Sequence, residues 1–219
     1  DFSHSHFAMR ERVFPAVCWV WHTPSLMQPP LPTYNVLALS NWQSYGLFQY
    51  QTVPSKVADP HCGVPFVEQP SDYFVFIGRA HPSKGMLEAA EICKDLKVAL
   101  NIIGGLGPSD DRSYLNRVLT LCDDKVQYFG QVSDEVKNSL LAKAQALIYP
   151  IAYVGQAGEA HSHKGVDALL AGVPVVAYNQ GALDEVIEDG VDGFLVKTTK
   201  EFKEAMLKTK ELDHNNIRQ

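Results

Sequence analysis

Residues 71–105, SDYFVFIGRAHPSKGMLEAAEICKDLKVALNIIGG, decide the fold of this chain. The run from Tyr73 to Ile77 is short and continuously apolar, which is typical of a strand covered on both faces. From Gly85 to Leu96 the apolar residues recur at helical spacing and form one stripe. Val98 to Ile103 is a second apolar run. The stretch therefore predicts a strand, a helix and a second strand, the βαβ unit of a parallel sheet.

The same alternation continues downstream. Helices are expected at about Ser109–Cys122, from Ser133 onward and at Lys164–Ala171, and strands at Val126–Phe129, Ala146–Tyr149, Val173–Tyr178 and Phe194–Val196. Ser109 and Ser133 are the predicted N-caps of their helices. This alternation predicts an α/β fold with a doubly wound parallel sheet. Ligands of such sheets bind beyond the carboxyl ends of the strands, so functional residues are expected in the loops there.

The composition excludes several classes of function. The chain has 219 residues, 46% of them apolar, which suffices for a large buried core. Its formal net charge of -6 disfavours a nucleic-acid binder. No stretch approaches the roughly 20 apolar residues of a membrane span, and the first residues do not resemble a signal peptide. No two cysteines have CxxC spacing, which argues against a metal knuckle and favours a cytoplasmic protein.

The composition changes near residue 70. Residues 1–70 hold 9 of the 13 prolines and only 7 of the 44 charged side chains, whereas residues 71–219 hold most glycines and charges. Two domains are therefore expected, 1–70 and 71–219. The first is too short for a full α/β sheet, so we expect either a fragment of a longer protein or an unusually small enzyme.

The loop after the first strand of the 71–219 region, Gly78 to Gly85, carries two cations. Arg79 and Lys84 flank the start of a helix, and an Arg fork with a Lys point charge suits a diphosphate. The alternative is an exposed loop with two solvated cations. After the next strand, the Gly104–Gly105 turn would let a ligand approach the backbone closely, although a plain turn would look the same.

The loop after the strand that ends at Tyr149 enters another helix and carries further polar residues. The free N–H groups at a helix start form an anion site. Glu159 precedes the expected helix and Asp167 lies about two turns in, so the two acids could face different ends of one ligand. The alternative for Glu159 is an acid that the helix dipole favours at a helix start, and the alternative for Asp167 is a position on a solvated helix face. A zinc site at His161 and His163 is disfavoured because no third ligand is evident.

In order, these motifs resemble a known family. GRAHPSKG, NIIGG, a strand ending in YP, Glu159-x7-Asp167 and LLAGVPVVAYNQGALDEVIEDGVDGFLV are similar to the donor-binding half of retaining glycosyltransferases with the GT-B fold. The closest likeness is to family 4 of the sequence-based classification, and it covers about residues 71–200.

The resemblance implies a role for each matching residue. Arg79 and Lys84 match the pair that clamps the diphosphate of a nucleotide sugar, and Glu159 matches the acid that contacts the donor sugar. Asp167 stands at the position of the acid that holds the ribose hydroxyls, where the family has Glu, so its reach is shorter. The other residues assigned to donor binding are Gly78, Gly104, Gly105, His161, Ser162, His163 and Lys164.

Residues 1–70 resemble part of the acceptor-binding domain of the same enzymes. Asp1 to His6 (DFSHSH) resembles a loop of that domain, and His22 follows an expected strand where that domain faces the cleft. His6 is therefore a candidate for acceptor binding and His22 a candidate catalytic residue. Loop histidines without a catalytic role are the alternative.

These expectations combine into a function. The resemblance implies a hexosyltransferase (EC 2.4 type) that moves a sugar from a nucleoside-diphosphate sugar, with UDP or GDP favoured, to an acceptor hydroxyl, with retention and without a metal or cofactor. The acceptor would be a glycan, a lipid or a small molecule, and nucleic acid is not an expected partner. Peripheral contact with the inner membrane face and homo-oligomerisation stay open.

Two further functions stay open beside this one: a nucleotide-sugar-binding module without transferase activity, and a GT-B-fold epimerase or hydrolase. A Rossmann dehydrogenase is disfavoured because no strand is followed by GxGxxG.

Overall fold

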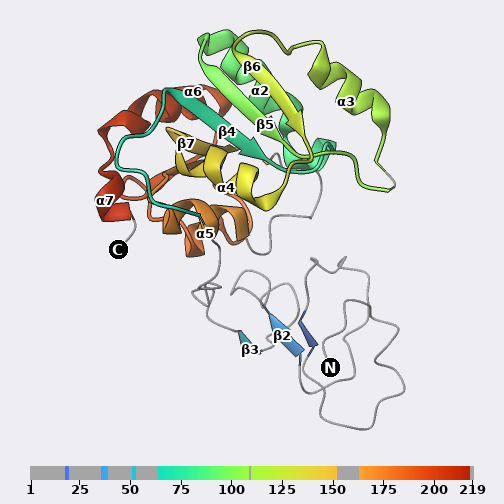
Figure 1. Cartoon of the computed structure of the whole chain (residues 1–219). Coiled ribbons are helices and arrows are strands. Elements are labelled where there is room, and N and C mark those ends of the chain that lie inside the picture. Colours follow the sequence, from blue (N-terminus) through green and yellow to red (C-terminus); the bar gives the residue numbers. More distant parts are fainter. Residues whose placement is uncertain are drawn as a thin grey trace, which may run out of the picture. The chain divides into compact units, whose positions relative to one another are not determined.

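The structure is a computed structural model of residues 1–219 (Figure 1). It describes residues 64–108, 110–151 and 163–217, together with the backbone of three short strands nearer the N-terminus. The chain divides into two compact units. One comprises Asp1–Ala58, Tyr153–Ser162 and Gln180–Val186, and the other Asp59–Ala152, His163–Asn179 and Ile187–Gln219.

The first unit contains a small parallel sheet. Its strands are β1 (Cys18–Trp19), β2 (Val36–Ala38) and β3 (Gln51–Thr52), in the order β1-β2-β3. The register pairs Cys18 with Val36 and Leu37 with Gln51. This unit also contains the 3-10 turn η3 (Leu183–Glu185).

The second unit is built on a six-stranded sheet in which all paired strands are parallel. The strands are β4 (Tyr73–Ile77), β5 (Ala99–Ile103), β6 (Val126–Gly130), β7 (Ala146–Tyr149), β8 (Val175–Tyr178) and β9 (Gly193–Val196). Their order is β6-β5-β4-β7-β8-β9. This is the doubly wound order 3-2-1-4-5-6, in which the winding direction reverses beside the first strand. The switch point therefore lies between the ends of β4 and β7.

Helices connect these strands and follow the last one. They are η2 (Pro82–Lys84), α2 (Met86–Leu96), α3 (Arg112–Leu119), α4 (Asp134–Ala142), α5 (His163–Leu170), α6 (Thr199–Lys208), η4 (Thr209–Glu211) and α7 (His214–Ile217). None of the helices in the described part of the chain combines the length and the apolar character needed to cross a membrane.

The central strands β4, β7 and β8 are buried on both faces, which is why they are almost continuously apolar. Alternate strand residues such as Phe74, Phe76 and Ile102 form the main core with residues of α2, α3 and α6. The intervening residues, such as Val75 and Leu147, are also fully buried. In Figure 1, α4 and α5 lie on this other face. Because these strands are covered on both faces, they appear in the sequence as continuous apolar runs.

Most of the expected elements are confirmed, and a few details differ. The expected strands at 73–77 and 146–149 have the predicted bounds, and Ser133 caps α4 by accepting a bond from the Val136 N–H. The expected start of α3 is wrong: the helix begins at Arg112, and the Asp111 carboxylate caps it by accepting from the Ser113 N–H at 2.8 Å. The predicted cap Ser109 itself lies outside the described residues.

The helix α6 was not predicted. Its start has a capping box, in which Thr198 Oγ1 accepts from the Glu201 N–H and the Glu201 carboxylate accepts from the Thr198 N–H. This Thr-x-x-Glu spacing is a helix-start signal that the sequence carried.

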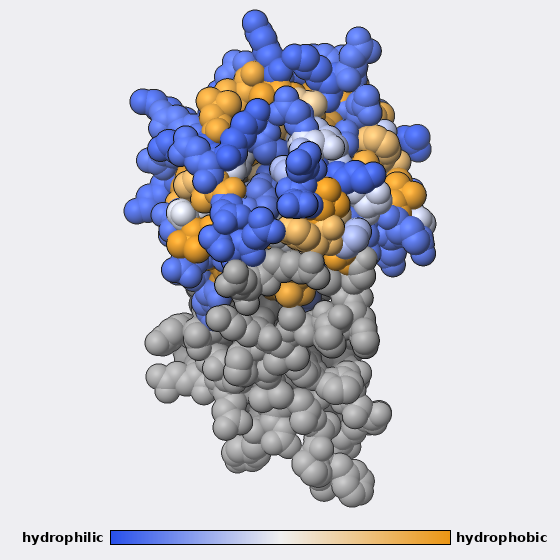
Figure 2. Space-filling view, turned by 60° about the vertical axis from the view of Figure 1, so that its left-hand side comes forward, coloured by the Kyte–Doolittle hydropathy of each residue, from blue (hydrophilic) through white to orange (hydrophobic). Residues whose placement is uncertain are grey.

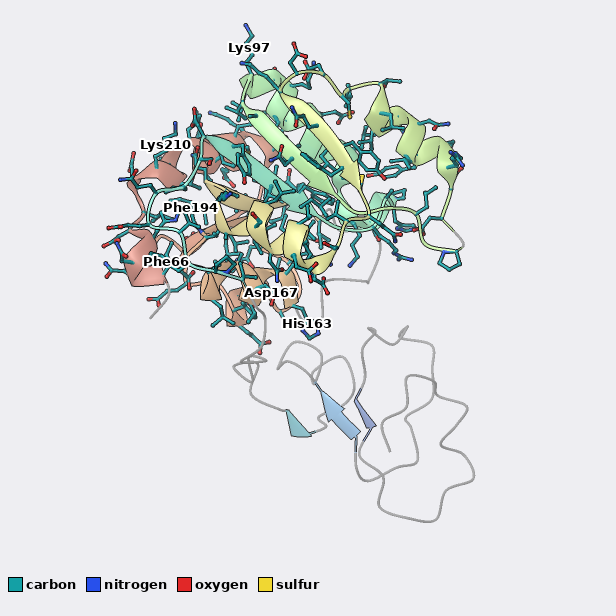
Figure 3. All side chains as sticks on the ribbon, in the orientation of Figure 1. Phe66, Lys97, His163, Asp167, Phe194 and Lys210 are labelled. Atoms are coloured by element: carbon teal, nitrogen blue, oxygen red, sulfur yellow. The ribbon has the colours of Figure 1, made fainter. Side chains whose placement is uncertain are left out.

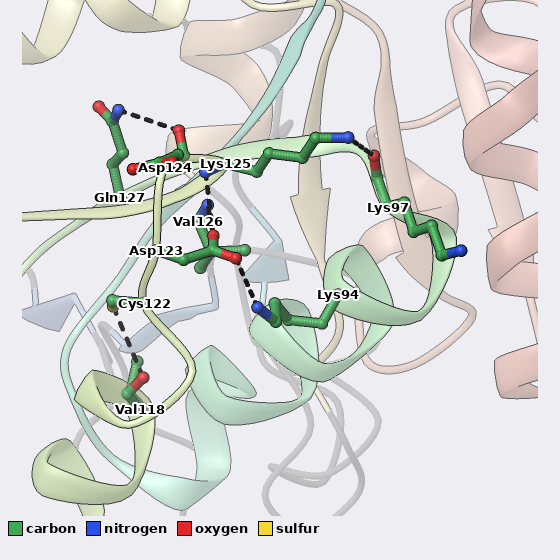
Figure 4. Close-up of polar contacts among 9 residues, drawn as sticks. All are labelled: Lys94, Lys97, Val118, Cys122, Asp123, Asp124, Lys125, Val126 and Gln127. Carbon is green, nitrogen blue, oxygen red and sulfur yellow. Dashed lines mark hydrogen bonds and ion pairs between the residues drawn. The ribbon is translucent and has the colours of Figure 1, made fainter.

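Charged groups are gathered at the amino edge of the sheet, opposite the loops that follow the strands (Figure 4). Asp123 Oδ2 accepts from Lys94 Nζ at 2.6 Å, and Asp123 Oδ1 accepts from the Val126 N–H at 2.8 Å. Lys125 Nζ donates to the carbonyl oxygen of Lys97, the C-cap residue that follows α2 and lies in the left-handed region. These bonds form a polar cluster at the amino edge that stabilises the starts of β5 and β6.

The coloured part of the face in Figure 2 is mainly polar. Figure 2 shows hydrophilic side chains over most of one face, with hydrophobic ones scattered among them. The large hydrophobic residues exposed in the described part of the chain are Leu119, Phe129, Val136, Val191 and Leu207.

Candidate functional site

The site of interest is the carboxyl edge of the six-stranded sheet at its switch point. Register pairs Ile77 with Ile103 at the ends of β4 and β5, and β7 pairs with β4 on the other side. The loops that follow these strands therefore emerge side by side. In open α/β sheets this crevice is where ligands bind.

The loop from Gly78 to Gly85 has a defined local structure. His81 is the N-cap of η2: its Nδ1 accepts from the Ser83 N–H at 3.2 Å and lies 2.7 Å from Ser83 Oγ. Lys84 is the last residue of η2 and is half-buried. Gly85 then has φ of 73°, and a Cβ there would lie 1.9 Å from the Pro150 carbonyl oxygen. Only glycine fits, so the loop after β4 directly contacts the residue after β7.

Backbone contacts join the loops after β4 and β5. The Gly78 N–H donates to the Ile103 carbonyl at 2.9 Å, and the Ala80 N–H donates to the Gly105 carbonyl at 2.8 Å. A Cβ added to Gly104 would lie 1.8 Å from the Gly78 carbonyl oxygen. A Cβ added to Gly78 would lie 3.7 Å from that of Lys84. The structure thus brings together five predicted site residues, Gly78, Arg79, Lys84, Gly104 and Gly105.

Arg79 has a partner that the sequence analysis missed. Its Nη1 lies 3.4 Å from Asp110 Oδ1, and the side-chain exposures are 49% for Arg79 and 2% for Asp110. Asp110 Oδ2 also accepts from the Gly107 N–H at 2.6 Å. The Gly107-x-x-Asp110 spacing could have indicated this bond within the turn, because Asp side chains often bond to backbone groups nearby, but it carries no signal for the pairing with Arg79.

Three predicted residues lie on α5, on the other side of the switch point. Figure 3 shows His163 and Asp167 on this helix, and Lys164 follows His163 in the chain. The helix α5 packs against β7 and β8. Asp167 lies four residues after His163, the first residue of α5 that the structure describes, which is about one turn further along the helix.

Five predicted residues lie outside the described part of the chain: His6, His22, Glu159, His161 and Ser162. Their roles stay predictions, as do the donor-binding roles of the residues that the structure describes. Among the described residues, no three His, Cys, Asp or Glu side chains come together as ligands for a metal ion.

The chemistry that this arrangement can perform is recognition of an anion. Arg79 has a half-exposed guanidinium and Lys84 an ammonium group in one short loop. The backbones of that loop and the next are held rigidly by hydrogen bonds and by glycine contacts. Preorganised cations stabilise negative charge on a phosphate more strongly than mobile ones, because little reorganisation is needed on binding.

Known proteins resemble this chain in sequence. The model of the family "Glycosyl transferases group 1" matches residues 71–211. An uncharacterized 41.2 kDa protein in the cps region of Klebsiella pneumoniae is 28% identical over 138 residues, which are 62% of this chain and 35% of that protein.

Solved structures share the fold. AviGT4, a glycosyltransferase involved in avilamycin A biosynthesis, has a TM-score of 0.71 at 20% identity, covering 94% of this chain and 63% of its own. HepE of Anabaena in complex with UDP-glucose has a TM-score of 0.67 at 17% identity, covering 92% and 66%. The chain thus spans about a third of the curated relative and less than two thirds of either solved chain. The expected α/β, GT-B-like fold is confirmed.

Proposed function

Because the chain belongs to the family of group 1 glycosyl transferases, we propose that it provides the donor-binding part of a retaining hexosyltransferase of family 4. The donor is a nucleoside-diphosphate sugar, with UDP or GDP as the nucleotide. The acceptor is a hydroxyl of a glycan, a lipid or a small molecule. Transfer needs no metal ion, and the protein acts in the cytoplasm, where it can contact the inner membrane face.

One observation carries the proposal: the cation-bearing loop after β4 lies at the switch point of the sheet and is braced by the loop after β5. Arg79 and Lys84 in this loop bind the donor diphosphate. Support for the ligand class comes from HepE, a structural neighbour that was solved with UDP-glucose.

The same residues suggest how the leaving group departs. Negative charge builds up on the diphosphate as the bond to the sugar breaks, and the two cations stabilise it there. This is the task that a divalent metal would otherwise perform. Glu159 orients the donor sugar, and the leaving phosphate oxygen accepts the proton of the acceptor hydroxyl. Asp167 holds the ribose, and His22 positions the acceptor.

Binding of donor fragments tests the proposal. We expect calorimetry to detect micromolar binding of UDP or GDP, about -8 kcal/mol, in buffer with EDTA. Arg79→Ala should weaken this binding at least about tenfold, because it removes a charge-assisted contact. Arg117→Ala is the matched control: it removes an exposed arginine from the last turn of α3 and should leave the affinity unchanged.

Three outcomes would contradict parts of the proposal. If no nucleotide binds, the donor site is assigned wrongly. If binding requires a divalent metal ion, the metal-independent mechanism is wrong. If the nucleotide sugar is hydrolysed or epimerised without any acceptor and no transfer product forms, the protein is not a transferase.

A further inference from the structure

We propose that Asp110 is a positioning residue that holds the Arg79 guanidinium ready for the phosphate groups of the donor. The inference rests on the proposed function, because it takes the donor diphosphate as the ligand of Arg79. Asp110 belongs to none of the motifs that identify the family in this sequence.

The carboxylate of Asp110 is anchored by its own loop. The Gly107 N–H donates to Asp110 Oδ2 at 2.6 Å, and the Asp110 N–H donates to the Gly107 carbonyl at 3.1 Å. These two bonds close a tight turn around the side chain. Backbone groups of its own loop therefore hold the carboxylate in addition to Arg79.

Burial makes a positive partner necessary. The Asp110 side chain is only 2% exposed, and an ionised carboxylate that is removed from water is costly unless a charge or several donors compensate it. Asp110 Oδ1 lies 3.4 Å from Arg79 Nη1. The guanidinium is the cation that faces this oxygen.

Gly107 gives the arginine a surface to lie against. A Cβ added there would be 3.1 Å from both Arg79 Cδ and Arg79 Nη1, and 2.9 Å from Asp110 Oδ2. The end of the Arg79 side chain therefore lies across the Gly107 backbone. A side chain at position 107 would occupy the space that the guanidinium uses.

The pair leaves Arg79 able to bind a ligand. Its side chain remains 49% exposed, and a guanidinium has five N–H donors, of which an ion pair to one oxygen engages few. Asp110 thus restricts the rotamers of a long side chain without covering it. Restricting them before the ligand arrives reduces the entropy lost on binding.

A negative charge close to Arg79 also has an opposing effect, since it repels phosphate. The sign of the effect of Asp110→Asn separates the two. If positioning dominates, removal of the charge weakens nucleotide binding; if repulsion dominates, removal strengthens it. We expect weakening, because the anchored carboxylate is neutralised by the arginine that it holds.

The experiment is a double-mutant cycle on the full chain, with UDP and GDP as ligands. Asp110→Asn should weaken binding about fivefold or more when Arg79 is present and less than about twofold in the Arg79→Ala background. Asp111→Asn is the control: it removes the same charge one residue further on, where the carboxylate caps α3, and Asn is an equally good cap. It should change the affinity less than about twofold in both backgrounds.

Some results would overturn the inference. One is equal weakening of nucleotide binding by Asp110→Asn in the wild-type and Arg79→Ala backgrounds, which a general structural role would produce. The other is unchanged or tighter nucleotide binding by Asp110→Asn. A ligand-free readout keeps the inference separate from the proposed function. Phenylglyoxal should modify Arg79 faster in Asp110→Asn than in the wild type, measured by peptide mass spectrometry with Arg112 as internal reference. Equal rates would also overturn it, whether or not any nucleotide binds.

Discussion

At the residue scale, Gly104 allows the loops after β4 and β5 to touch. Its φ of 137° lies in a region that favours glycine, and a Cβ there would lie 1.8 Å from the Gly78 carbonyl oxygen. Its own N–H donates to the Gly130 carbonyl at 2.8 Å. The backbone around this position is held from two sides and has no room to move away.

A pair of alanine variants separates backbone strain from collision at this position. Gly190 has φ of 80°, and a Cβ there would meet no atom within 4 Å, so Gly190→Ala should cost only about 1 kcal/mol of strain. Gly104→Ala should lower the free energy of unfolding by about 3 kcal/mol or more, because strain and collision add. Urea unfolding of both variants measures this. Equal losses would show that the loop can shift at little cost.

At the scale of elements, Tyr178 joins β8 to two helices. Its hydroxyl donates to Glu88 Oε1 of α2 at 2.5 Å and lies 2.9 Å from Thr199 Oγ1 of α6. Its ring packs against Phe202 of α6 at a centroid distance of 5.1 Å. Burial, and then the hydrogen bond to the Glu88 carboxylate, raises the pKa of Tyr178 to about 12. One side chain thus ties three elements of the core together.

Removal of this hydroxyl should be costly. Tyr178→Phe is expected to lower the free energy of unfolding by about 1.5–3 kcal/mol, the range for hydrogen bonds to charged groups. Tyr73→Phe is the matched control, since the Tyr73 hydroxyl donates to the neutral Leu140 carbonyl, and it should cost about 1 kcal/mol. Urea unfolding compares the two losses.

The pKa of Tyr178 makes a second measurement possible. The folded value lies above the ordinary tyrosine pKa of about 10, so this contribution to stability is complete below pH 10 and is lost as pH rises to about 12. Absorbance titration at alkaline pH should show that Tyr178→Phe lacks one of the last tyrosines to ionise. A variant that retains this late step would contradict the assignment.

At the scale of the whole second unit, several exposed carboxylates have a lowered pKa, which predicts a loss of stability in acid. Hydrogen bonding to Lys94, and then to the Val126 and Lys125 N–H groups, lowers the pKa of Asp123 to about 2. Other carboxyl groups have a lowered pKa because of hydrogen bonds to lysines, to hydroxyls or to backbone N–H groups: Asp95, Asp111, Asp134, Glu135 and Glu201. They lie on several elements, so acid weakens the unit at many points together.

The direction of this pH dependence follows from the lowered values. Groups with a folded pKa below the unfolded one stabilise the protein above about pH 4, and this contribution is lost as pH falls through the folded value. The urea midpoint should therefore fall between about pH 4 and pH 2. Asp123→Asn should reduce that fall more than the control Asp124→Asn, which removes a charge from the next residue. Equal curves for both variants would contradict the role of Asp123.

The sequence by itself determined most of the elements and the loop that carries the candidate site. The βαβ unit over residues 71–105, the strand at 146–149 and the cap at Ser133 are local patterns: apolar runs, helical spacing and a hydroxyl before a helix. Arg79 and Lys84 were recognisable because they follow a predicted strand. The start of α3 was predicted too early, and α6 was missed although Thr198 and Glu201 signalled its start.

Only the tertiary structure decided which distant residues meet. The strand order puts the end of β4 next to that of β7, so Gly85 lies against Pro150. The pairing of Arg79 with Asp110 depends on two loops that parallel strands bring to the same edge. Such contacts join residues far apart in the chain, and their free energy comes from burial and geometry. Local sequence patterns report neither of these, because both arise only when the sheet and its helices pack together.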